Sequence, residues 1–446
     1  MGLKTKMRKT WGRKFSKFYA LKEEFVAINP IFDTRYLDKK IGDYALSIVP
    51  RPASDTAINK NNVAFLASTL GRTGGHTELL KNFAQALPKK YKSNLFLTKK
   101  TDTEKNASLK VAEIKKYSKI SGVDFDWMNE KGLLKKLMKK LMKFSPSVLI
   151  TFIHMDDSFA VGLLALLNKY TKIKIIFCNI GSQHSSLGMS FAHLIWEGMP
   201  ATAYLTQKYR GFKNTKVLGL CYLTKDNLPT FSEQEIATVR RNMGIPENAI
   251  CTMTGCLAYK LFENDTSPYL EMIKKLLEKN ENLWHVLITR FDKKQKEIFD
   301  KKNMPKRFIL MDFKDNFKLY FKCADVFIDS IPHSSALTMV DLMSLRVPIV
   351  AFKNTDNLAF TFHEYLPKNY DYLFENISDM QAGIEKLYQS KDEQERIKNI
   401  NFEHFLEKFE GHNVVENVLN ANTFDLEIDD KQYENFKEIK LKSWPL

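Results

Sequence analysis

The chain of 446 residues lacks any apolar run long enough to span a bilayer. Apolar stretches such as Val161–Leu167 end after about one strand or two helical turns. The basic N-terminal segment has no apolar core behind it, which argues against a secretory signal, and Lys6 stands where a myristoylation motif has Ser or Thr. The five scattered cysteines form neither a disulfide framework nor a zinc pattern. We therefore expect a protein of the reducing cytoplasm.

Several ligand-binding motifs are missing as well. No Gly-Lys-Ser/Thr run completes a P-loop, no glycine fingerprint has the spacing of a dinucleotide site, and no carboxylate motif predicts a metal. No nucleic-acid-binding module is recognisable, so we expect no nucleic-acid partner. With 44% hydrophobic and 27% charged residues, the composition is that of a globular protein, and the length predicts two or three domains.

Positive charge, by contrast, is abundant. Basic residues outnumber acidic ones by 68 to 52, giving a formal net charge of +16 at pH 7. Such an excess favours an anionic partner, whether nucleic acid, a phosphorylated ligand or an acidic lipid surface. The charge gathers in residues 4–17 and in Lys131–Phe144, where lysines alternate with leucine and methionine at helical spacing. Basic amphipathic helices can lie on anionic membranes. Alternatively, the apolar stripe of Lys131–Phe144 packs on a sheet while its lysines face water.

Short β-rich runs alternate with helical patterns along most of the chain, which predicts parallel sheets covered by helices. Helical patterns lie over Thr77–Leu87, Ser158–Asn168 and Pro268–Lys279. The predicted strands of the first half are Asn62–Ser68, Ser93–Leu97, Ser147–Ile153, Ile173–Ile180, Ala201–Leu205 and Lys216–Leu220. After a polar break at Thr224–Ser232, strands are predicted at Ala249–Thr254, Leu283–Ile288, Phe308–Met311, Val326–Ile328 and Pro348–Phe352.

These two series of strands predict an α/β protein with two doubly wound, Rossmann-like domains facing across a cleft. Ligands of such folds bind at the carboxyl ends of the strands. We place the first domain at residues 61–225 and the second at residues 226–425. A basic, helical extension at residues 1–60 precedes them. The polar segment 426–446 is expected to form a helix that crosses back to the first domain.

A glycine-rich loop follows the first predicted strand. Gly74 and Gly75 lie between Gly71 and the pair His76-Thr77, at the point where a helix begins. Glycines let backbone N–H groups approach a phosphate or a sugar closely, and Thr77 or His76 can cap the helix. A strand-turn-helix connection also needs glycine for purely structural reasons, so both roles remain open.

The segment Phe321–Val350 carries the most specific pattern in the chain. The pattern consists of Ala324-Asp325, the run Asp329-Ser330-Ile331-Pro332, Thr338, Asp341 and Val347-Pro348. In these residues the chain resembles the GT-B glycosyltransferases, particularly the branch with O-linked N-acetylglucosamine transferases and bacterial cytoplasmic protein glucosyltransferases. In that branch a strand ends in an acidic residue, a small residue and a proline. A small polar loop and a helix carrying an aspartate then lead to a strand marked by Val-Pro.

The resemblance implies a donor site at this helix. Its N-terminus, at Ser335, Leu337 and Thr338, is expected to hold the diphosphate of a nucleotide sugar, and Asp341 the ribose hydroxyls. Unpaired N–H groups and the helix dipole favour an anion near Thr338, and a carboxylate one turn deeper can accept from two hydroxyls. The branch has a histidine and a second threonine just before Thr338, where this chain has Ala336 and Leu337.

Two other segments are assigned to the donor by the same resemblance. Enzymes of this fold often have a glycine and then a basic residue after the first strand of the second domain, which here are Gly255 and Lys260. Lys260 is therefore expected to contact the donor phosphate, although taken alone it reads equally well as an ordinary surface lysine. Lys314, with Phe313 beside it, lies where the fold commonly touches the base.

Retaining enzymes of this fold commonly carry two glutamates eight positions apart. The corresponding positions here hold His333 and Asp341, which favours an inverting mechanism. Inversion needs a general base that deprotonates the acceptor as it attacks the anomeric carbon. Each candidate in the first half can instead be a helix cap or a satisfied polar contact. In order of preference, the candidates are His184, then Asp156 with its neighbour Asp157, and then His76.

We therefore expect a glycosyltransferase that moves a hexose from a nucleotide diphosphate sugar, by resemblance a UDP-sugar. The acceptor would be a bacterial lipopolysaccharide, capsule or lipid-linked glycan, or a protein. The resemblance implies no metal and no cofactor besides the donor, because the helix dipole and basic side chains stabilise the leaving diphosphate. The expected location is the cytoplasm, with contact to the inner face of the cytoplasmic membrane through the basic N-terminus.

Two alternatives remain. One is a nucleotide-sugar epimerase of the same architecture, which forms product without an acceptor. The other is a catalytically silent relative that stabilises an active partner. The departure at Ala336 and Leu337 keeps the second alternative open.

Overall fold

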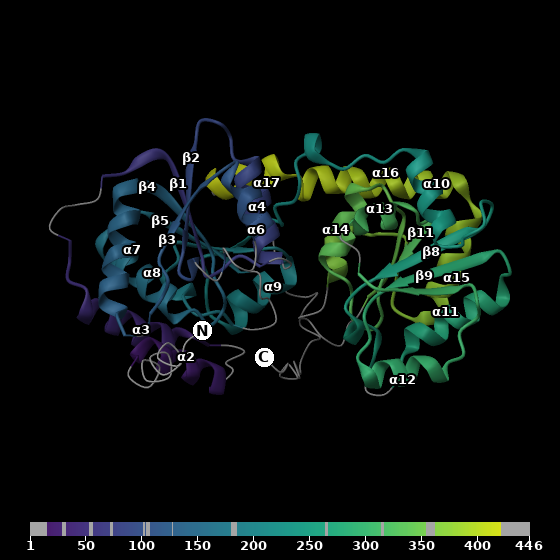
Figure 1. The fold of residues 1–446 in the computed structure, drawn as a ribbon, viewed down its shortest axis with the longest axis horizontal. Coiled ribbons are helices and arrows are strands. Elements are labelled where there is room, and N and C mark those ends of the chain that lie inside the picture. Colours follow the sequence, from purple (N-terminus) through teal and green to yellow (C-terminus); the bar gives the residue numbers. More distant parts are fainter. Residues whose placement is uncertain are drawn as a thin grey trace. The chain divides into compact units, whose positions relative to one another are not determined.

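The computed structural model describes residues 16–28, 33–52, 57–71, 75–100, 103, 108–126, 128–179, 185–263, 266–313, 316–353 and 362–420. These residues form two compact units, each built around one sheet (Figure 1). Unit 1 contains the described residues up to Tyr222 together with those from Gly411 onward. Unit 2 contains the described residues between Leu223 and Glu410.

The sheet of unit 1 has seven parallel strands in the order β3-β2-β1-β4-β5-β6-β7. They are β1 (Asn59–Ala67), β2 (Lys92–Leu97), β3 (Lys119–Gly122), β4 (Pro146–Phe152), β5 (Lys174–Asn179), β6 (Leu194–Glu197) and β7 (Thr215–Val217). The last six residues of β1 are all buried, as expected for a strand covered on both faces. The strand order reverses between β1 and β4, the point at which doubly wound sheets bind ligands.

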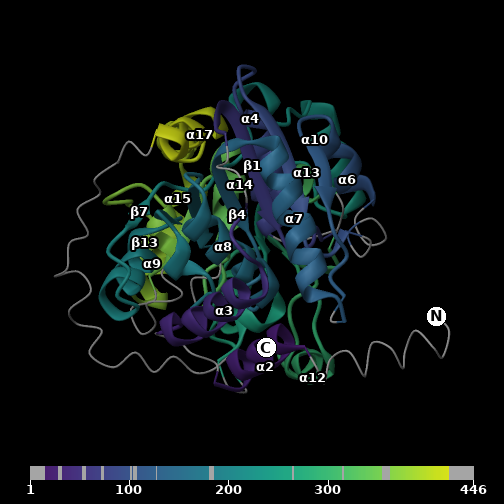
Figure 2. The same ribbon diagram turned by 90° about the vertical axis from the view of Figure 1, so that its left-hand side faces the viewer.

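Helices cover both faces of this sheet. α4 packs beside α6, and α7 packs beside α8, as Figures 1 and 2 show from two directions. The helices and helical turns of unit 1 are α2 (Lys17–Ile28), α3 (Arg35–Ile48), α4 (Gly75–Ala86), α6 (Ser108–Lys115), α7 (Glu130–Phe144), α8 (Ser158–Tyr170), η1 (Met189–Phe191), α9 (Pro200–Tyr204), η2 (Leu205–Tyr209) and α17 (Gly411–Asn420).

The first two helices, α2 and α3, belong to the core of unit 1. Both pack against α8, where Gly162 admits the ring of Phe18, because a Cβ at that position would lie 2.6 Å from the ring. Asp38 of α3 is fully buried and accepts hydrogen bonds from the backbone N–H groups of Gly188 (2.7 Å) and Ser190 (3.2 Å). Burial raises the pKa of Asp38 to about 6, and these hydrogen bonds oppose the rise. The N-terminal helices are thus fastened to the sheet by both apolar packing and a buried carboxylate.

The sheet of unit 2 has six parallel strands in the order β10-β9-β8-β11-β12-β13. They are β8 (Ile250–Gly255), β9 (Leu283–Ile288), β10 (Phe308–Met311), β11 (Val326–Ile328), β12 (Ile349–Phe352) and β13 (Leu373–Phe374). The helices and turns are η3 (Lys225–Asn227), α10 (Glu233–Asn242), η4 (Ala258–Leu261), α11 (Pro268–Lys279), α12 (Lys293–Lys301), α13 (Phe317–Lys322), α14 (Leu337–Ser344), η6 (Phe362–Tyr365), α15 (Ile377–Gln389) and α16 (Lys391–Lys408).

After α16 the chain returns to unit 1. Helix α17 packs against α4, and the carbonyl oxygen of Ala86 lies 3.0 Å from His412 Nδ1. The carbonyl of Gly411 accepts a hydrogen bond from Cys221 Sγ at 3.8 Å. The predicted tail helix at residues 426–446 lies outside the described residues. Among the helices that the structure describes, none is both long and apolar enough to cross a membrane.

The prediction of two doubly wound α/β domains is confirmed. Strands β9, β10 and β11 and helix α11 have the predicted bounds. The predicted strand Ala201–Leu205 is wrong, because these residues lie in α9 and η2, with Pro200 at the first helical position, where its missing N–H costs nothing. The actual strands on either side, β6 and β7, are only four and three residues long, and β3, β6 and β13 were not predicted at all.

Candidate functional site

The carboxyl edge of the sheet in unit 2 begins with the end of β8. Gly255 is the last residue of this strand, and a Cβ there would meet the ring of Phe321 at 2.5 Å, so the glycine lets α13 pack close to the strand. Leu257, two residues later, is exposed at 54%. Phe313, which follows β10, is exposed at 46%. Two large apolar side chains therefore stand in solvent after strands of the same sheet, next to the positions predicted to bind a donor.

Lys260 is nearly buried in η4 and is not an ordinary surface lysine. Its Nζ donates a hydrogen bond to the carbonyl oxygen of Ser334 at 2.6 Å. Burial lowers the pKa of Lys260, and the nearby carboxylate of Asp329 opposes that effect. The ammonium thus reaches the loop between β11 and α14, the loop that was predicted to carry the donor diphosphate.

A buried carboxylate holds the same loop from inside. Asp329 directly follows β11 and accepts hydrogen bonds from the backbone N–H of Ser335 (2.9 Å) and from its hydroxyl (2.5 Å). Burial raises the pKa of Asp329, and hydrogen bonds from Ser334 and Ser335 oppose the rise. The hydroxyl of Ser330 donates to the carbonyl oxygen of His333 at 2.6 Å. These contacts fix residues 329–335 as a closed loop at the start of α14.

Helix α14 begins without a side-chain cap. Its N-cap residue, Ala336, has φ 57° and ψ −113°, a conformation that residues with a Cβ rarely adopt. Leu337 is the first helical residue, and the backbone N–H of Thr338 is 3.4 Å from the carbonyl oxygen of Ser335. The three predicted residues Ser335, Leu337 and Thr338 therefore lie at the start of α14, but the N–H of Ser335 donates to Asp329 and that of Thr338 to Ser335. A helix N-terminus without a side-chain cap favours a bound anion.

Asp341 lies one turn further along α14 and is nearly buried. Its Oδ1 forms an ion pair of 3.1 Å with Nζ of Lys318 on α13. The sequence pattern did not indicate Lys318, because the pairing depends on how α13 packs against α14. A ligand hydroxyl that binds Asp341 has to share the carboxylate with this lysine.

The glycine-rich loop of unit 1 leads into α4. Gly75 and His76 are the first two residues of the helix, and the hydroxyl of Thr77 accepts a hydrogen bond from the backbone N–H of Gly71 at 2.9 Å. This bond closes the loop from β1 onto the helix. His76 is partly buried, and burial together with the neighbouring His154 lowers its pKa to about 4. His76 is therefore neutral at physiological pH and retains a lone pair for a proton.

His154 follows β4 and was not among the predicted site residues. Its ring centroid is 5.9 Å from that of His76, and its Nε2 is 3.3 Å from the hydroxyl of Thr69, which follows β1. The two histidines thus meet where the strand order of the sheet reverses. The sequence could have indicated His154, because it comes just after an apolar strand. The prediction instead favoured Asp156 and Asp157, the two carboxylates that follow it.

Those two carboxylates have structural partners. Asp156 forms an ion pair of 2.9 Å with Lys22 of α2. Asp157 caps α8 by accepting from the N–H of Ala160 (3.0 Å), and it also accepts from the hydroxyls of Ser68 (2.5 Å) and Thr98 (2.8 Å). Asp157 therefore has a structural role: it joins the start of α8 to the residues that follow β1 and β2. The remaining predicted residues, Gly74, His184 and Lys314, lie outside the described residues.

No protein-family model matches the chain, and no curated protein matches it in sequence. Solved structures do match. Anabaena HepE in complex with UDP and glucose is 13% identical, and the match covers 81% of this chain and 99% of HepE with a TM-score of 0.62. An O-GlcNAc transferase variant from Thermobaculum terrenum is 12% identical over 91% of this chain and 76% of that protein, with a TM-score of 0.55.

The chain has the GT-B fold. The resemblance inferred from the segment Phe321–Val350 is confirmed at the level of the fold. The same fold carries more than one activity among the similar structures. A protein of Listeria monocytogenes assigned as a UDP-N-acetylglucosamine 2-epimerase is 12% identical over 81% of this chain and 96% of its own, with a TM-score of 0.54.

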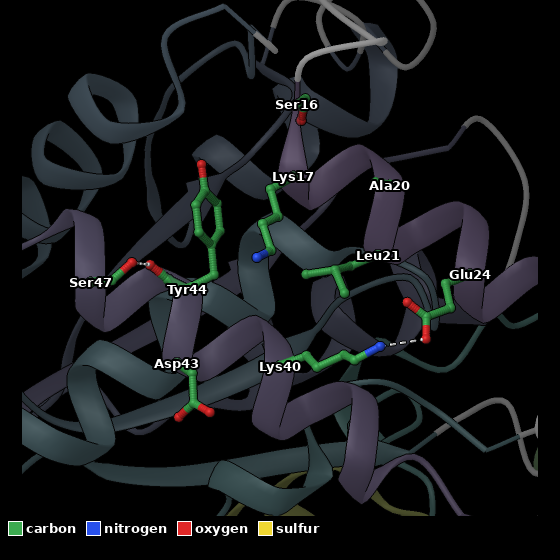
Figure 3. A pocket seen from close by; sticks show the side chains of 9 residues that line it. All are labelled: Ser16, Lys17, Ala20, Leu21, Glu24, Lys40, Asp43, Tyr44 and Ser47. Carbon is green, nitrogen blue, oxygen red and sulfur yellow. Dashed lines mark hydrogen bonds and ion pairs between the residues drawn. The ribbon is translucent and has the colours of Figure 1, made fainter.

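A surface groove of this GT-B chain is lined by the two N-terminal helices. It has a volume of about 670 Å³ and runs between α2 and α3 of unit 1 (Figure 3). Lys40 and Glu24 pair across it at 2.8 Å, and Nζ of Lys17 lies 5.6 Å from the ring centroid of Tyr44. Asp43, which also lines the groove, pairs with Lys39 at 2.6 Å. In the part of the chain that the structure describes, no cluster of His, Cys, Asp or Glu is arranged to hold a metal ion.

Proposed function

We propose that the chain is a glycosyltransferase that binds the nucleotide of a UDP-sugar at α14 of unit 2. The observation that carries the proposal is the loop of residues 329–335, which Asp329 and Lys260 hold from inside so that it ends at an uncapped helix N-terminus. A helix N-terminus without a side-chain cap suits a diphosphate. HepE, which shares the fold, is solved with UDP and glucose, and this supports UDP as the nucleotide.

Each donor residue has a distinct role in this proposal. The N–H of Leu337 binds the diphosphate, the N–H of Thr338 joins it by exchanging its 3.4 Å bond to Ser335, and the ammonium of Lys260 adds positive charge beside it. Asp341 accepts from the ribose hydroxyls and shares its carboxylate with Lys318. Phe313 gives the base an apolar surface.

The chemical step is a displacement with inversion at the anomeric carbon. The acceptor hydroxyl loses its proton to a base as its oxygen bonds to that carbon, while the bond to the diphosphate breaks and UDP leaves with the electron pair. The helix N-terminus and Lys260 stabilise the charge on UDP without a metal. Among the described candidates we assign the base to His76 because it lies at the ligand-binding edge of unit 1 and its ring is neutral near pH 7, although a pKa lowered to about 4 makes it a weaker base than an ordinary histidine. Asp156 is less suited to be the base because it forms an ion pair with Lys22.

The acceptor that we propose is a bacterial cell-surface or lipid-linked glycan at the inner face of the cytoplasmic membrane. The excess of positive charge supports an acceptor carried on an anionic surface. A catalytically silent relative is the second candidate. The observation in its favour is that Ala336 offers no side chain to the diphosphate while Lys318 occupies the carboxylate of Asp341.

An assay of product with and without acceptor separates these functions. Purified protein is incubated with a panel of UDP-sugars, and both UDP release and the stereochemistry of the recovered sugar are measured. Acceptor-dependent UDP release supports the transferase. A sugar epimerised without any acceptor supports an epimerase, as in the Listeria protein that shares the fold. UDP binding without either reaction favours the silent relative and contradicts the transferase.

A further inference from the structure

Helix α7 of unit 1 is amphipathic, and its apolar side is already occupied by the core. Leu134, Leu137 and Leu141 are fully buried, and Met138 nearly so. They belong to the hydrophobic core that also contains residues of α8 and β4. The sequence left open whether the apolar stripe lies on a membrane or packs inside the protein. In the structure it packs into the core of unit 1. Insertion of this stripe into a bilayer would require the core of unit 1 to open.

The opposite side of α7 is a row of free lysines. Five of them are exposed, and none forms an ion pair with a residue that the structure describes. A sixth, Lys140, donates to the carbonyl oxygen of Gly122 at 2.7 Å, and burial and the neighbouring Lys136 and Lys100 lower its pKa. The single acidic residue of the helix, Glu130, is buried and accepts from the hydroxyl of Tyr44 at 2.6 Å. The five exposed lysines, called here the α7 lysine row, are Lys131, Lys135, Lys136, Lys139 and Lys143.

Other surface helices of the protein are arranged differently. In α12, Lys296 pairs with Asp300, and in α11 Lys274 pairs with Glu278 within the helix. Lys398 of α16 pairs with Glu395. Exposed lysines that only serve solubility are normally interspersed with acids in this way. The α7 lysine row lacks such acids over 15 residues, a length of about 22 Å at the rise of an α-helix.

We propose that the α7 lysine row docks unit 1 on the surface of a bilayer that contains acidic phospholipids. In Figure 2, α7 lies at the surface of unit 1 on the side that faces the viewer. A membrane offers a flat, dense layer of negative charge, so lysines spaced along one straight helix engage it together without a specific geometry. Because the apolar side of α7 stays in the core, the contact is electrostatic and sensitive to salt.

The composition of the row favours lipid over nucleic acid. It contains no arginine, whose planar fork matches phosphate geometry, and no exposed aromatic ring on which bases stack. Lysine is a compact, hydrated charge that suits a diffuse anionic surface. The proposal does not depend on the transferase function, since it concerns a different face of the chain and is tested without any sugar.

The test uses the full chain and two charge-matched variants. The first reverses four members of the row, and the second reverses four exposed lysines of unit 2, so each variant loses eight charges from the net +16. Both are checked for unchanged thermal unfolding before use. The row variant is K135E/K136E/K139E/K143E, and the control variant is K293E/K301E/K306E/K368E.

Binding is measured by sedimentation with vesicles of phosphatidylcholine alone or with roughly one-third phosphatidylglycerol. Each lysine at such a surface contributes roughly fivefold in affinity. We expect binding only to the acidic vesicles, at least a tenfold loss in the row variant, and less than about a threefold loss in the control. Equal losses in both variants would mean that only net charge matters and would overturn the proposal. So would no binding of the unmodified chain, or a row variant that loses affinity for duplex DNA but not for vesicles.

A third variant distinguishes the row from the basic N-terminal segment. Reversal of Lys4, Lys6, Arg8 and Lys9 removes the same number of charges from residues that precede α2. If that variant alone abolishes binding to acidic vesicles while the row variant binds normally, the α7 lysine row is not the docking surface.

Discussion

The two carboxyl edges of the molecule are built by different means. In unit 2 the edge is organised by backbone, because a buried carboxylate and a nearly buried ammonium hold a loop whose N–H groups end at α14. In unit 1 the edge is organised by side chains, two histidines from different elements whose rings stand 5.9 Å apart. The comparison teaches that a site for a fixed anionic group can be pre-formed by main-chain geometry. The proton transfer that we propose for unit 1 would depend instead on a few rings whose environment sets their pKa.

The largest effect is expected from removing the buried carboxylate of unit 2. Asp329→Ala leaves the N–H and the hydroxyl of Ser335 without their acceptor and removes the carboxylate that opposes the burial of the Lys260 charge, so we expect a loss of about 4 kcal/mol in the free energy of unfolding. Urea unfolding followed by circular dichroism measures it. The matched control is Asp371→Ala, which breaks an exposed ion pair with Arg396 and should cost roughly 0.5 kcal/mol. Similar losses in the two variants would contradict the conclusion that Asp329 holds the loop of residues 329–335 in place.

His76→Gln removes one of the two histidines at the carboxyl edge of the sheet in unit 1. If His76 is the base, kcat should fall about a hundredfold while the UDP affinity stays unchanged. In the unmodified chain, any transferase activity that depends on His76 should fall only as pH drops through about 4, because the pKa of His76 is lowered and the ring stays neutral above that value. The control is His193→Gln, a ring that accepts from the N–H of Ile175 elsewhere in unit 1. An acid limb near 6.5 that His76→Gln leaves in place would exclude His76 as the base.

Phe313→Ala tests whether an apolar side chain of unit 2 contacts the base of the nucleotide. Loss of a large exposed ring that packs on the base should weaken UDP binding about tenfold, measured by calorimetry. Tyr117→Ala removes a ring of similar exposure, 42%, from unit 1 and should leave UDP binding unchanged. If both variants bind UDP like the unmodified chain, the base lies elsewhere.

The smallest effect concerns the strained start of α14. Ala336→Gly should raise the free energy of unfolding by about 1 kcal/mol, since glycine adopts a positive φ without steric cost. Ala237→Gly, in the exposed helix α10, should lower it by about 1 kcal/mol. Differential scanning calorimetry shows the two shifts in opposite directions. A destabilised Ala336→Gly would mean that the backbone at this residue is not strained.

The sequence predicted unit 2 better than unit 1 for identifiable reasons. β9, β10 and β11 match their predicted bounds because each is a compact apolar run with clear polar flanks. The β-rich composition of Ala201–Leu205 misled the prediction, since the helix there is set by Pro200 and tertiary packing. Edge strands as short as β3 and β13 carry too few residues for a period to appear.

The proposed donor site was predictable only as a list of positions. The spacing from Pro332 to Asp341 and on to Pro348 indicated a loop followed by a helix, and the structure has a loop and α14 at these residues. The roles of individual residues were less accessible. The pair Lys318–Asp341 joins two helices, and the meeting of His76 with His154 joins two loops, so neither is encoded in local spacing. Such pairings arise from packing, which sequence periodicity does not report.

The most direct test of the donor site is calorimetric titration with UDP of the unmodified chain, Asp341→Ala and Lys260→Ala. The account predicts micromolar-range binding by the unmodified chain, weakened at least tenfold, a loss of about 1.4 kcal/mol, in each folded variant. Lys408→Ala, which alters a partly buried lysine of α16 that pairs with Glu407, should bind UDP normally. If the unmodified chain binds neither UDP nor any other nucleoside diphosphate, or if both site variants bind as tightly as it does, α14 is not the donor site.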